Sequence, residues 1–219
     1  TQGPLLASIE SFLGESLHFY DAAAPVVTKE SLDMGCVFEG SRYERGSDYL
    51  NCPMDEAEYF AFVRELVAAK TAPLHAFETP KVFEGCMPVE VMAARGAQTL
   101  AFGPLKPVGL ADPATGRRPY AVLQLRRENL KGDAYNMVGF QTRLTYPEQK
   151  RVFSLIPALS RAVSHRYGSI HRNTYFDSPR VLNRDLSLKG YPRVFLAGQL
   201  TGVEGYMESA STGIYAAIG

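Results

Sequence analysis

The 219-residue sequence is 46% hydrophobic, which supports one or two buried cores of ordinary size and is typical of a soluble globular protein. No stretch reaches the roughly 20 uninterrupted apolar residues of a membrane span, and the N-terminus lacks the pattern of a signal peptide, so we expect a cytoplasmic protein without membrane contacts. The 23 basic and 23 acidic side chains cancel, but residues 1–80 hold 5 and 13 of them, whereas residues 81–219 hold 18 and 10.

The first predicted elements are two extended segments and a helix. Residues 17–27 are predicted to form a strand that leads into a proline turn, and residues 49–52 a short extended piece. The clearest helix covers residues 55–70, because Asp55 and Glu58 match a capping box and apolar side chains recur at helical spacing. The remaining predicted elements are helices at 88–94 and 145–156 and strands at 120–125, 135–142, 171–176 and 193–197. Helices between strands predict an α/β core that carries an inserted α+β unit.

Three cysteines, Cys36, Cys52 and Cys86, show neither a disulfide framework nor the spacing of a metal site, so no metal is expected. Cys86 comes just before a helix predicted to begin at Pro88. The positive end of a helix dipole lowers the pKa of a nearby thiol, which makes Cys86 the best candidate for a nucleophile. Glu84 opposes this effect, and a buried structural cysteine is the alternative. Cys52 is interpreted as structural.

A glycine-rich loop follows the last predicted strand, in the string FLAGQLTGVEGYMESA (195–210). A strand, such a loop and the start of a helix bring backbone N–H groups close to a ligand, where they favour a phosphate or the electron-rich edge of a flavin. An ordinary strand-to-helix turn is the alternative. The GxGxxG fingerprint of a dinucleotide-binding turn does not occur in the 219 residues.

The basic residues of the second half include a run that we interpret as a candidate RNA-binding surface, because Lys and Arg release counterions when they meet a polyanion. Solvated surface charge is the alternative. The candidates are Arg117, Arg118, Arg126, Arg127, Lys150 and Arg151.

Five long strings carry a resemblance that runs from end to end of the chain. They are FEGCMPVEVMAARG (83–96), FGPLKPVGL (102–110), YNMVGFQTRLTYPEQKRVFSLIP (135–157), HRNTYFDSP (171–179) and FLAGQLTGVEGYMESASTG (195–213). They resemble the folate- and FAD-dependent tRNA uracil C5-methyltransferases, often called the Gid family.

The resemblance implies an enzyme that methylates the T-loop uridine of tRNA at C5. Methylenetetrahydrofolate would supply the carbon, reduced FAD the electrons, and NAD(P)H would reduce the flavin again. Cys86 matches the family's nucleophile, and Tyr206 an aromatic residue close to the flavin. The loop along the cofactor would comprise Gly198, Gln199, Gly202, Val203, Glu204, Gly205 and Tyr206.

The resemblance also implies a domain organisation: a Rossmann-like FAD-binding domain of glutathione-reductase type in residues 1–30 and 141–219, and an inserted α+β substrate domain in residues 31–140. The family's GxGxxG unit and a further active-site cysteine are not in this chain. We therefore expect a fragment without the ADP half of the FAD site, which binds FAD weakly and turns over no tRNA by itself. Two alternatives are a flavoenzyme that modifies wobble uridines, and a non-catalytic tRNA-binding remnant.

Overall fold

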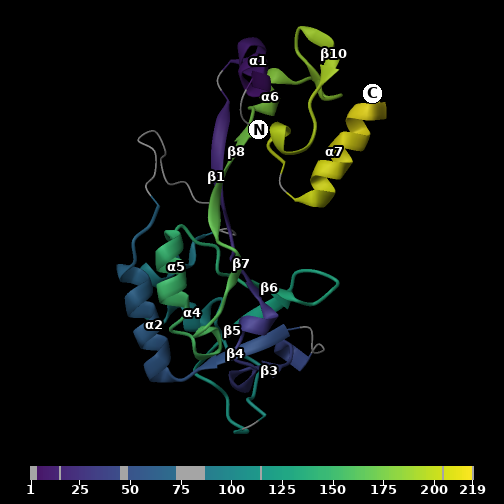
Figure 1. Ribbon diagram of the computed structural model, residues 1–219. Coiled ribbons are helices and arrows are strands. Elements are labelled where there is room, and N and C mark those ends of the chain that lie inside the picture. Colours follow the sequence, from purple (N-terminus) through teal and green to yellow (C-terminus); the bar gives the residue numbers. More distant parts are fainter. Residues whose placement is uncertain are drawn as a thin grey trace. The chain divides into compact units, whose positions relative to one another are not determined.

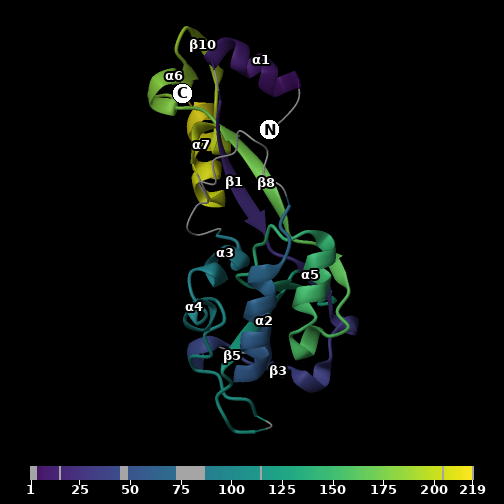
Figure 2. The ribbon, with the colours of Figure 1, turned by 90° about the vertical axis from the view of Figure 1, so that its left-hand side faces the viewer.

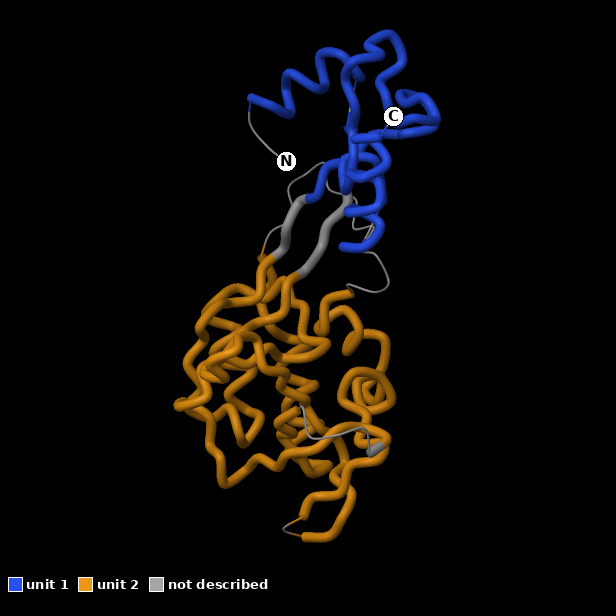
Figure 3. Tube along the Cα trace, turned by 90° about the vertical axis from the view of Figure 1, so that its right-hand side faces the viewer, with its two compact units in different colours: residues 1–21, 172–219 blue, residues 22–171 orange. Residues whose placement is uncertain are grey.

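The structure is a computed structural model of the chain, and it forms two compact units. It describes residues 4–14, 16–44, 49–72, 87–113, 115–203 and 205–218, and of residues 18–22, 44 and 170–172 it describes the backbone alone. Unit 1 comprises residues 1–21 and 172–219, and unit 2 residues 22–171 (Figure 3). Unit 2 extends beyond the expected 31–140 at both ends, because a strand before it and a helix and a strand after it belong to its sheet and core.

Unit 2 is built on a six-stranded sheet in which every neighbouring pair runs antiparallel. Figure 1 labels five of its strands, β3, β4, β5, β6 and β7. The order is β3-β4-β5-β6-β2-β7, and β4 pairs with β5 so that Cys52 lies opposite Leu123. The strands are β2 (Val26–Thr28), β3 (Phe38–Glu39), β4 (Tyr49–Met54), β5 (Ala121–Arg127), β6 (Ala134–Met137) and β7 (Ser164–Arg166). The expected mixture of helices and strands is confirmed.

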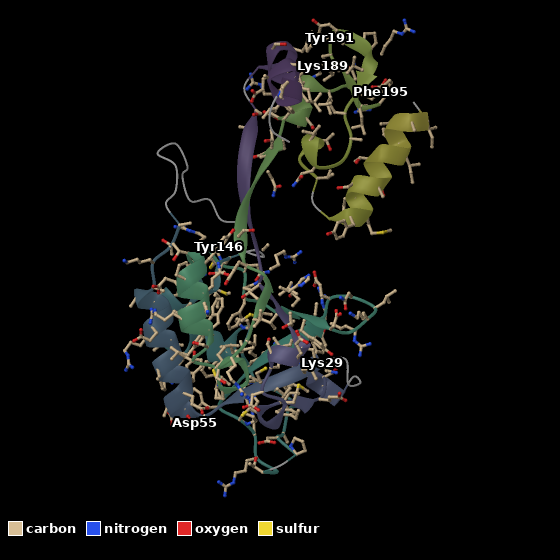
Figure 4. The ribbon with its side chains drawn as sticks, in the orientation of Figure 1. Lys29, Asp55, Tyr146, Lys189, Tyr191 and Phe195 are labelled. Atoms are coloured by element: carbon tan, nitrogen blue, oxygen red, sulfur yellow. The ribbon has the colours of Figure 1, made fainter. Side chains whose placement is uncertain are left out.

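Helices cover one face of this sheet and enclose the main core (Figure 2). They are α2 (Glu56–Ala68), α3 (Val89–Ala94), α4 (Thr99–Phe102) and α5 (Tyr146–Phe153), with short 3-10 turns at Lys29–Ser31, Met34–Cys36, Arg42–Glu44 and Pro157–Leu159. α2 begins where predicted, because Asp55 accepts a hydrogen bond from the Glu58 N–H and the Glu58 carboxylate accepts one from the Asp55 N–H, each 2.8 Å long (Figure 4 labels Asp55). Its buried side chains are Tyr59, Phe62, Val63 and Leu66.

A rigid loop lies against the chain that precedes β4. The Arg42 guanidinium donates to the carbonyl groups of Lys106 and Pro104, at 3.0 and 2.7 Å. Gly109 has φ +70°, and a Cβ there would lie 2.8 Å from the Tyr43 nitrogen, so a side chain would collide with the backbone. These contacts hold the loop of residues 103–110 against Arg42 and Tyr43.

Unit 1 has a small core of Leu6, Phe176, Leu182, Leu188 and Leu196. Its elements are α1 (Pro4–Leu13), α6 (Ser178–Val181), β9 (Ser187–Leu188), β10 (Tyr191–Phe195), the 3-10 turn η6 (Gly198–Thr201) and α7 (Tyr206–Ile218). β9 and β10 pair with each other. Strands β1 (Leu17–Ala23) and β8 (Ser169–Tyr175) form a second two-stranded sheet, and each runs from one unit into the other.

Two predicted strands differ from the structure. The strand predicted over 135–142 ends at Met137, because Gly139 adopts φ +77° in a turn and a Cβ there would lie 2.7 Å from the Pro104 Cβ. The strand predicted over 193–197 lies two residues earlier, as β10, because the chain turns into η6 after Ala197. The apolar residues 194–197 suggest a buried strand, but β10 is exposed or half-buried throughout, and of these four residues Leu196 alone is buried. Within the described ranges, no helix combines the length and the apolar character needed to cross a bilayer.

Candidate functional site

The predicted glycine loop is present between β10 and α7. Gly198, Gly202 and Gly205 have φ values of +64°, +83° and +82°, a region that side-chain-bearing residues rarely adopt. Between the first two, η6 forms a single tight turn. The three glycines are therefore required by the path of the backbone, which explains their spacing in the sequence.

Hydrogen bonds hold this loop to its neighbours within unit 1. The Gly198 N–H donates to the Thr212 Oγ1 inside α7, and the Thr201 hydroxyl donates to the Gly198 carbonyl, both at 2.8 Å. The Phe176 N–H, just after β8, donates to the Leu200 carbonyl at 2.9 Å. A Cβ on Gly202 would lie 3.3 Å from the Tyr175 ring, so the loop also approaches β8 closely.

The residues of the loop suit a flavin ring edge better than a phosphate. α7 starts directly after Gly205, which has no side chain to cap the first N–H groups of the helix. Those N–H groups and the helix dipole attract electron-rich atoms. However, Glu208 lies in the first turn of α7, and its carboxylate would repel an anion. Tyr206 is 97% exposed and Gln199 is exposed, so both are available to a ligand. Glu204 lies outside the described residues.

Cys86 also lies outside the described residues, but the helix that the sequence predicts after it is present. α3 starts at Val89, one residue later than expected, with Pro88 as its N-cap. Met87 and Val89 are buried, and the Val89 N–H donates to the Gln141 carbonyl at 2.7 Å. The chain is therefore fixed in the core from the residue that follows Cys86.

A buried carboxylate in α3 ties this helix to the segment after β6. Glu90 is only 6% exposed, and its two oxygens accept hydrogen bonds from the Thr142 hydroxyl (2.9 Å) and the Arg143 N–H (2.8 Å). Burial raises the pKa of Glu90, and its hydrogen bonds offset part of that rise. The Arg143 Nε is buried and has no hydrogen-bond partner within the described part of the chain.

The polar network continues to the start of β8. The Gln149 side-chain amide donates to the carbonyl groups of Leu144 and Gly168, and its oxygen accepts from the Gly168 N–H at 2.8 Å. Sequence reasoning missed Glu90, Thr142 and Gln149. The sequence carries only a weak sign of these buried polar side chains: Glu90 is a polar residue in a segment that is otherwise largely apolar.

The raised pKa of buried Glu90 makes the free energy of unfolding depend on pH in a specific direction. A glutamate in the unfolded chain has a pKa of about 4.3. Because the pKa of folded Glu90 is higher, the stability that this group contributes is complete below the unfolded pKa and is lost as pH rises through the folded pKa. Glu90→Gln cannot lose a proton, so the free energy of unfolding of wild type, measured by urea titration, should fall relative to that of Glu90→Gln as the pH rises above about 4.3.

Glu148→Gln is the matched control for this measurement. The Arg151 guanidinium holds the pKa of Glu148 below its usual range, so its contribution has the opposite sign and is lost as pH falls. A difference between wild type and Glu90→Gln that does not change with pH would contradict the assignment.

Of the two described thiols, that of Cys52 is excluded as a nucleophile by its surroundings. Cys52 is fully buried in the core, and burial raises the pKa of its thiol strongly, as expected for a structural cysteine. Cys36 is half-buried at the edge of a pocket of about 410 Å³.

The six candidate RNA-binding residues form three pairs on different parts of unit 2. Arg117 and Arg118 line the pocket beside Cys36, together with the carboxylates Asp55, Glu56, Glu58 and Asp112. Arg126 and Arg127 are exposed at the end of β5. Lys150 and Arg151 lie on α5, where Arg151 pairs with Glu65 (2.6 Å) and Glu148 (2.8 Å).

Comparison with known proteins gives consistent matches along the whole chain. The family model described as "Glucose inhibited division protein A" matches residues 1–219. Two similar proteins are named methylenetetrahydrofolate–tRNA-(uracil-5-)-methyltransferase TrmFO. The protein of Moorella thermoacetica is 60% identical, and the match covers 100% of this chain and 50% of that protein. The protein of Lactobacillus helveticus is 58% identical, and the match covers 100% of this chain and 54% of that protein. This chain thus spans about half the length of these relatives.

Solved structures agree at the level of the fold. Two crystal forms of Aquifex aeolicus GidA superpose with TM-scores of 0.62 and 0.63 over 97% of this chain, at 15% identity, and the match covers 33% and 35% of those chains. The resemblance seen in the sequence motifs is confirmed, and the chain belongs to the glucose-inhibited division protein A family.

Proposed function

We propose that this chain is part of an enzyme that methylates uridine in tRNA at C5, with methylenetetrahydrofolate as the carbon donor. The observation that carries the proposal is the 60% identity, over the whole chain, to a relative whose name states this activity. That relative is about twice as long, so the activity is proposed for the longer protein. Wobble-uridine modification has less support, because the names of the two relatives reported above state the uracil-5 reaction.

The described loop supports the use of FAD. The left-handed glycines Gly198, Gly202 and Gly205 and the exposed side chains of Tyr206 and Gln199 would hold the flavin, and Val203 and Glu204 are proposed to belong to the same cofactor loop. Reduced FAD, when bound, supplies the two electrons that take the transferred carbon from the methylene to the methyl level, and NAD(P)H would replenish them. We propose that unit 1 is the part of the chain that belongs to a Rossmann-like FAD-binding domain and that unit 2 is the inserted substrate domain.

Cys86 is the proposed nucleophile. C5 of uracil is a weak nucleophile until its C5–C6 double bond is broken by addition at C6. The Cys86 thiolate would form a bond to C6, and the electron pair of the double bond would move to C5, which then attacks the methylene carbon. Loss of the C5 proton would return that electron pair and expel the thiolate. Overall, the C5 hydrogen is replaced by a methyl group, methylenetetrahydrofolate becomes tetrahydrofolate, and reduced FAD is oxidised.

The proposal is tested with a chimera in which this chain replaces the matching half of the Moorella relative. Purified chimera with FAD, NADPH and methylene-labelled methylenetetrahydrofolate should transfer label to an unmodified tRNA transcript. A transcript with cytidine in place of the T-loop uridine should take up none. A chimera that binds FAD stoichiometrically but labels neither RNA would refute the function, and equal labelling of both would refute the T-loop assignment.

A further inference from the structure

A basic groove on unit 2 lies between α5 and the turn that precedes β7. Its volume is about 430 Å³, and it is lined by Pro147, Lys150, Arg151, Ser154, Ser160, Arg161, Ala162 and Val163. Three of these residues are cationic, two carry hydroxyl groups and none is acidic. The 3-10 turn Pro157–Leu159 brings Arg161 back towards Lys150, which lies eleven positions earlier in the chain.

The three cations of the groove are not equivalent. The Arg151 guanidinium is bound by Glu65 and Glu148, so these carboxylates neutralise it and fix its position. Among the described residues, the carboxylate paired with Arg161 is that of Asp33, which is distant at 4.0 Å, and the Arg161 side chain is 81% exposed. Lys150 is exposed and has no carboxylate within ion-pair distance in the part of the chain that the structure describes. Lys150 and Arg161 are therefore the groups available to a bound anion.

An exposed tyrosine that stacks on a half-buried one lies beside the groove. Tyr146, at the start of α5, stacks on Tyr167 with ring centroids 4.6 Å apart and an interplanar angle of 16° (Figure 4 labels Tyr146). Tyr146 is 56% exposed and lies four residues before Lys150, on the same side of the helix. A supported, exposed ring is the kind of surface on which an unpaired nucleobase stacks.

We propose that this groove binds one phosphate of an RNA strand between Lys150 and Arg161, with a neighbouring unpaired base on Tyr146. The cationic groups suit a phosphate, the hydroxyl groups a ribose and the exposed ring a base. A small anion would contact the cationic groups but not the ring. The pocket beside Arg117 and Arg118 is a poorer fit, because four carboxylates line it and would repel a phosphate. The identification of the RNA as tRNA rests on the proposed function.

The test is binding of fluorescently labelled, unmodified tRNA transcript to the 219-residue chain, followed by anisotropy at several salt concentrations. Lys150→Gln/Arg161→Gln should weaken binding about tenfold or more and reduce the slope of log K against log salt by roughly 1.4 to 1.8, as expected for two lost phosphate contacts. Tyr146→Leu should weaken binding about fivefold or more and leave the slope unchanged, because stacking releases no counterions.

The matched control is Arg64→Gln/Arg95→Gln, which removes two positive charges from exposed arginines of the same unit. It should bind tRNA like wild type, and circular dichroism should show all variants folded. Absence of tRNA binding by wild type, wild-type affinity in the Lys150/Arg161 variant, or an equal loss in the control would each overturn the proposal. The chimera assay decides the proposed function separately: salt-dependent binding through this groove without methylation would leave the groove in place and remove the function.

Discussion

Replacement of Cys86 by serine in the chimera is expected to reduce tRNA methylation by a factor on the order of 10³ or more, as when the nucleophile of a covalent mechanism is removed. Serine has nearly the same shape as cysteine, but its hydroxyl is not ionised near neutral pH and adds to C6 poorly. Because the two side chains are nearly isosteric, the substitution should leave the fold and FAD binding unchanged. The measurement is single-turnover transfer of label from methylenetetrahydrofolate to tRNA.

Cys36→Ser is the matched control, because Cys36 is half-buried and lies in a pocket that the mechanism does not use. It should retain full activity. A transcript with 5-fluorouridine in the T-loop gives a second readout, since fluorine at C5 prevents the proton loss that releases the thiolate. Wild type should form a covalent complex with this RNA on a denaturing gel and Cys86→Ser should not. Retention of more than about a tenth of the activity by Cys86→Ser would show that another group initiates the reaction.

The elements predicted well from the sequence are those fixed by residues that lie close together in the chain. α2 follows from a capping box that spans the four residues 55–58 and from apolar side chains one helical turn apart, and both signals lie within the helix or at its first residue boundary. The loop from Gly198 to Gly205 is similar, because three left-handed backbone positions leave three glycines in the sequence. The helix after Cys86 was also predicted to within one residue.

The features missed depend on contacts between distant parts of the chain. β2 has three residues and pairs with β6 and β7, which lie more than a hundred residues further along the chain. The sequence around β2 contains no pattern from which this pairing could be predicted. The bond between Glu90 and Thr142 joins positions 52 apart. The groove of Lys150 and Arg161 needs the turn at residues 157–159 to bring the two cations together. Charge counting found Lys150 and Arg151, but only the geometry shows that Arg151 is already paired.

Gly168 is a position in unit 2 where the addition of a single methyl group is expected to lower stability substantially. It lies just before β8, and a Cβ there would lie 2.5 Å from the Thr142 Cγ2 and 2.9 Å from the Ala23 carbonyl oxygen. Overpacking of this kind costs about 1–3 kcal/mol, and displacement of the Gln149 amide from Gly168 costs about 1 kcal/mol for each hydrogen bond lost. Gly168→Ala should therefore lower the free energy of unfolding by about 3 kcal/mol, measured by urea titration of the 219-residue chain.

Two further variants show whether the cause is the predicted collision. Gly96→Ala is the matched control in the same unit, because its Cβ would meet only the Thr99 hydroxyl, at 3.3 Å, which is free to rotate, so its effect should stay within about 0.5 kcal/mol. Thr142→Ser removes the methyl group that Gly168→Ala would strike and keeps the hydroxyl that donates to Glu90. Gly168→Ala should consequently cost less when combined with Thr142→Ser than by itself. Additive effects of the two substitutions would mean that the loss of stability arises elsewhere, at the Ala23 carbonyl or in the unfolded chain.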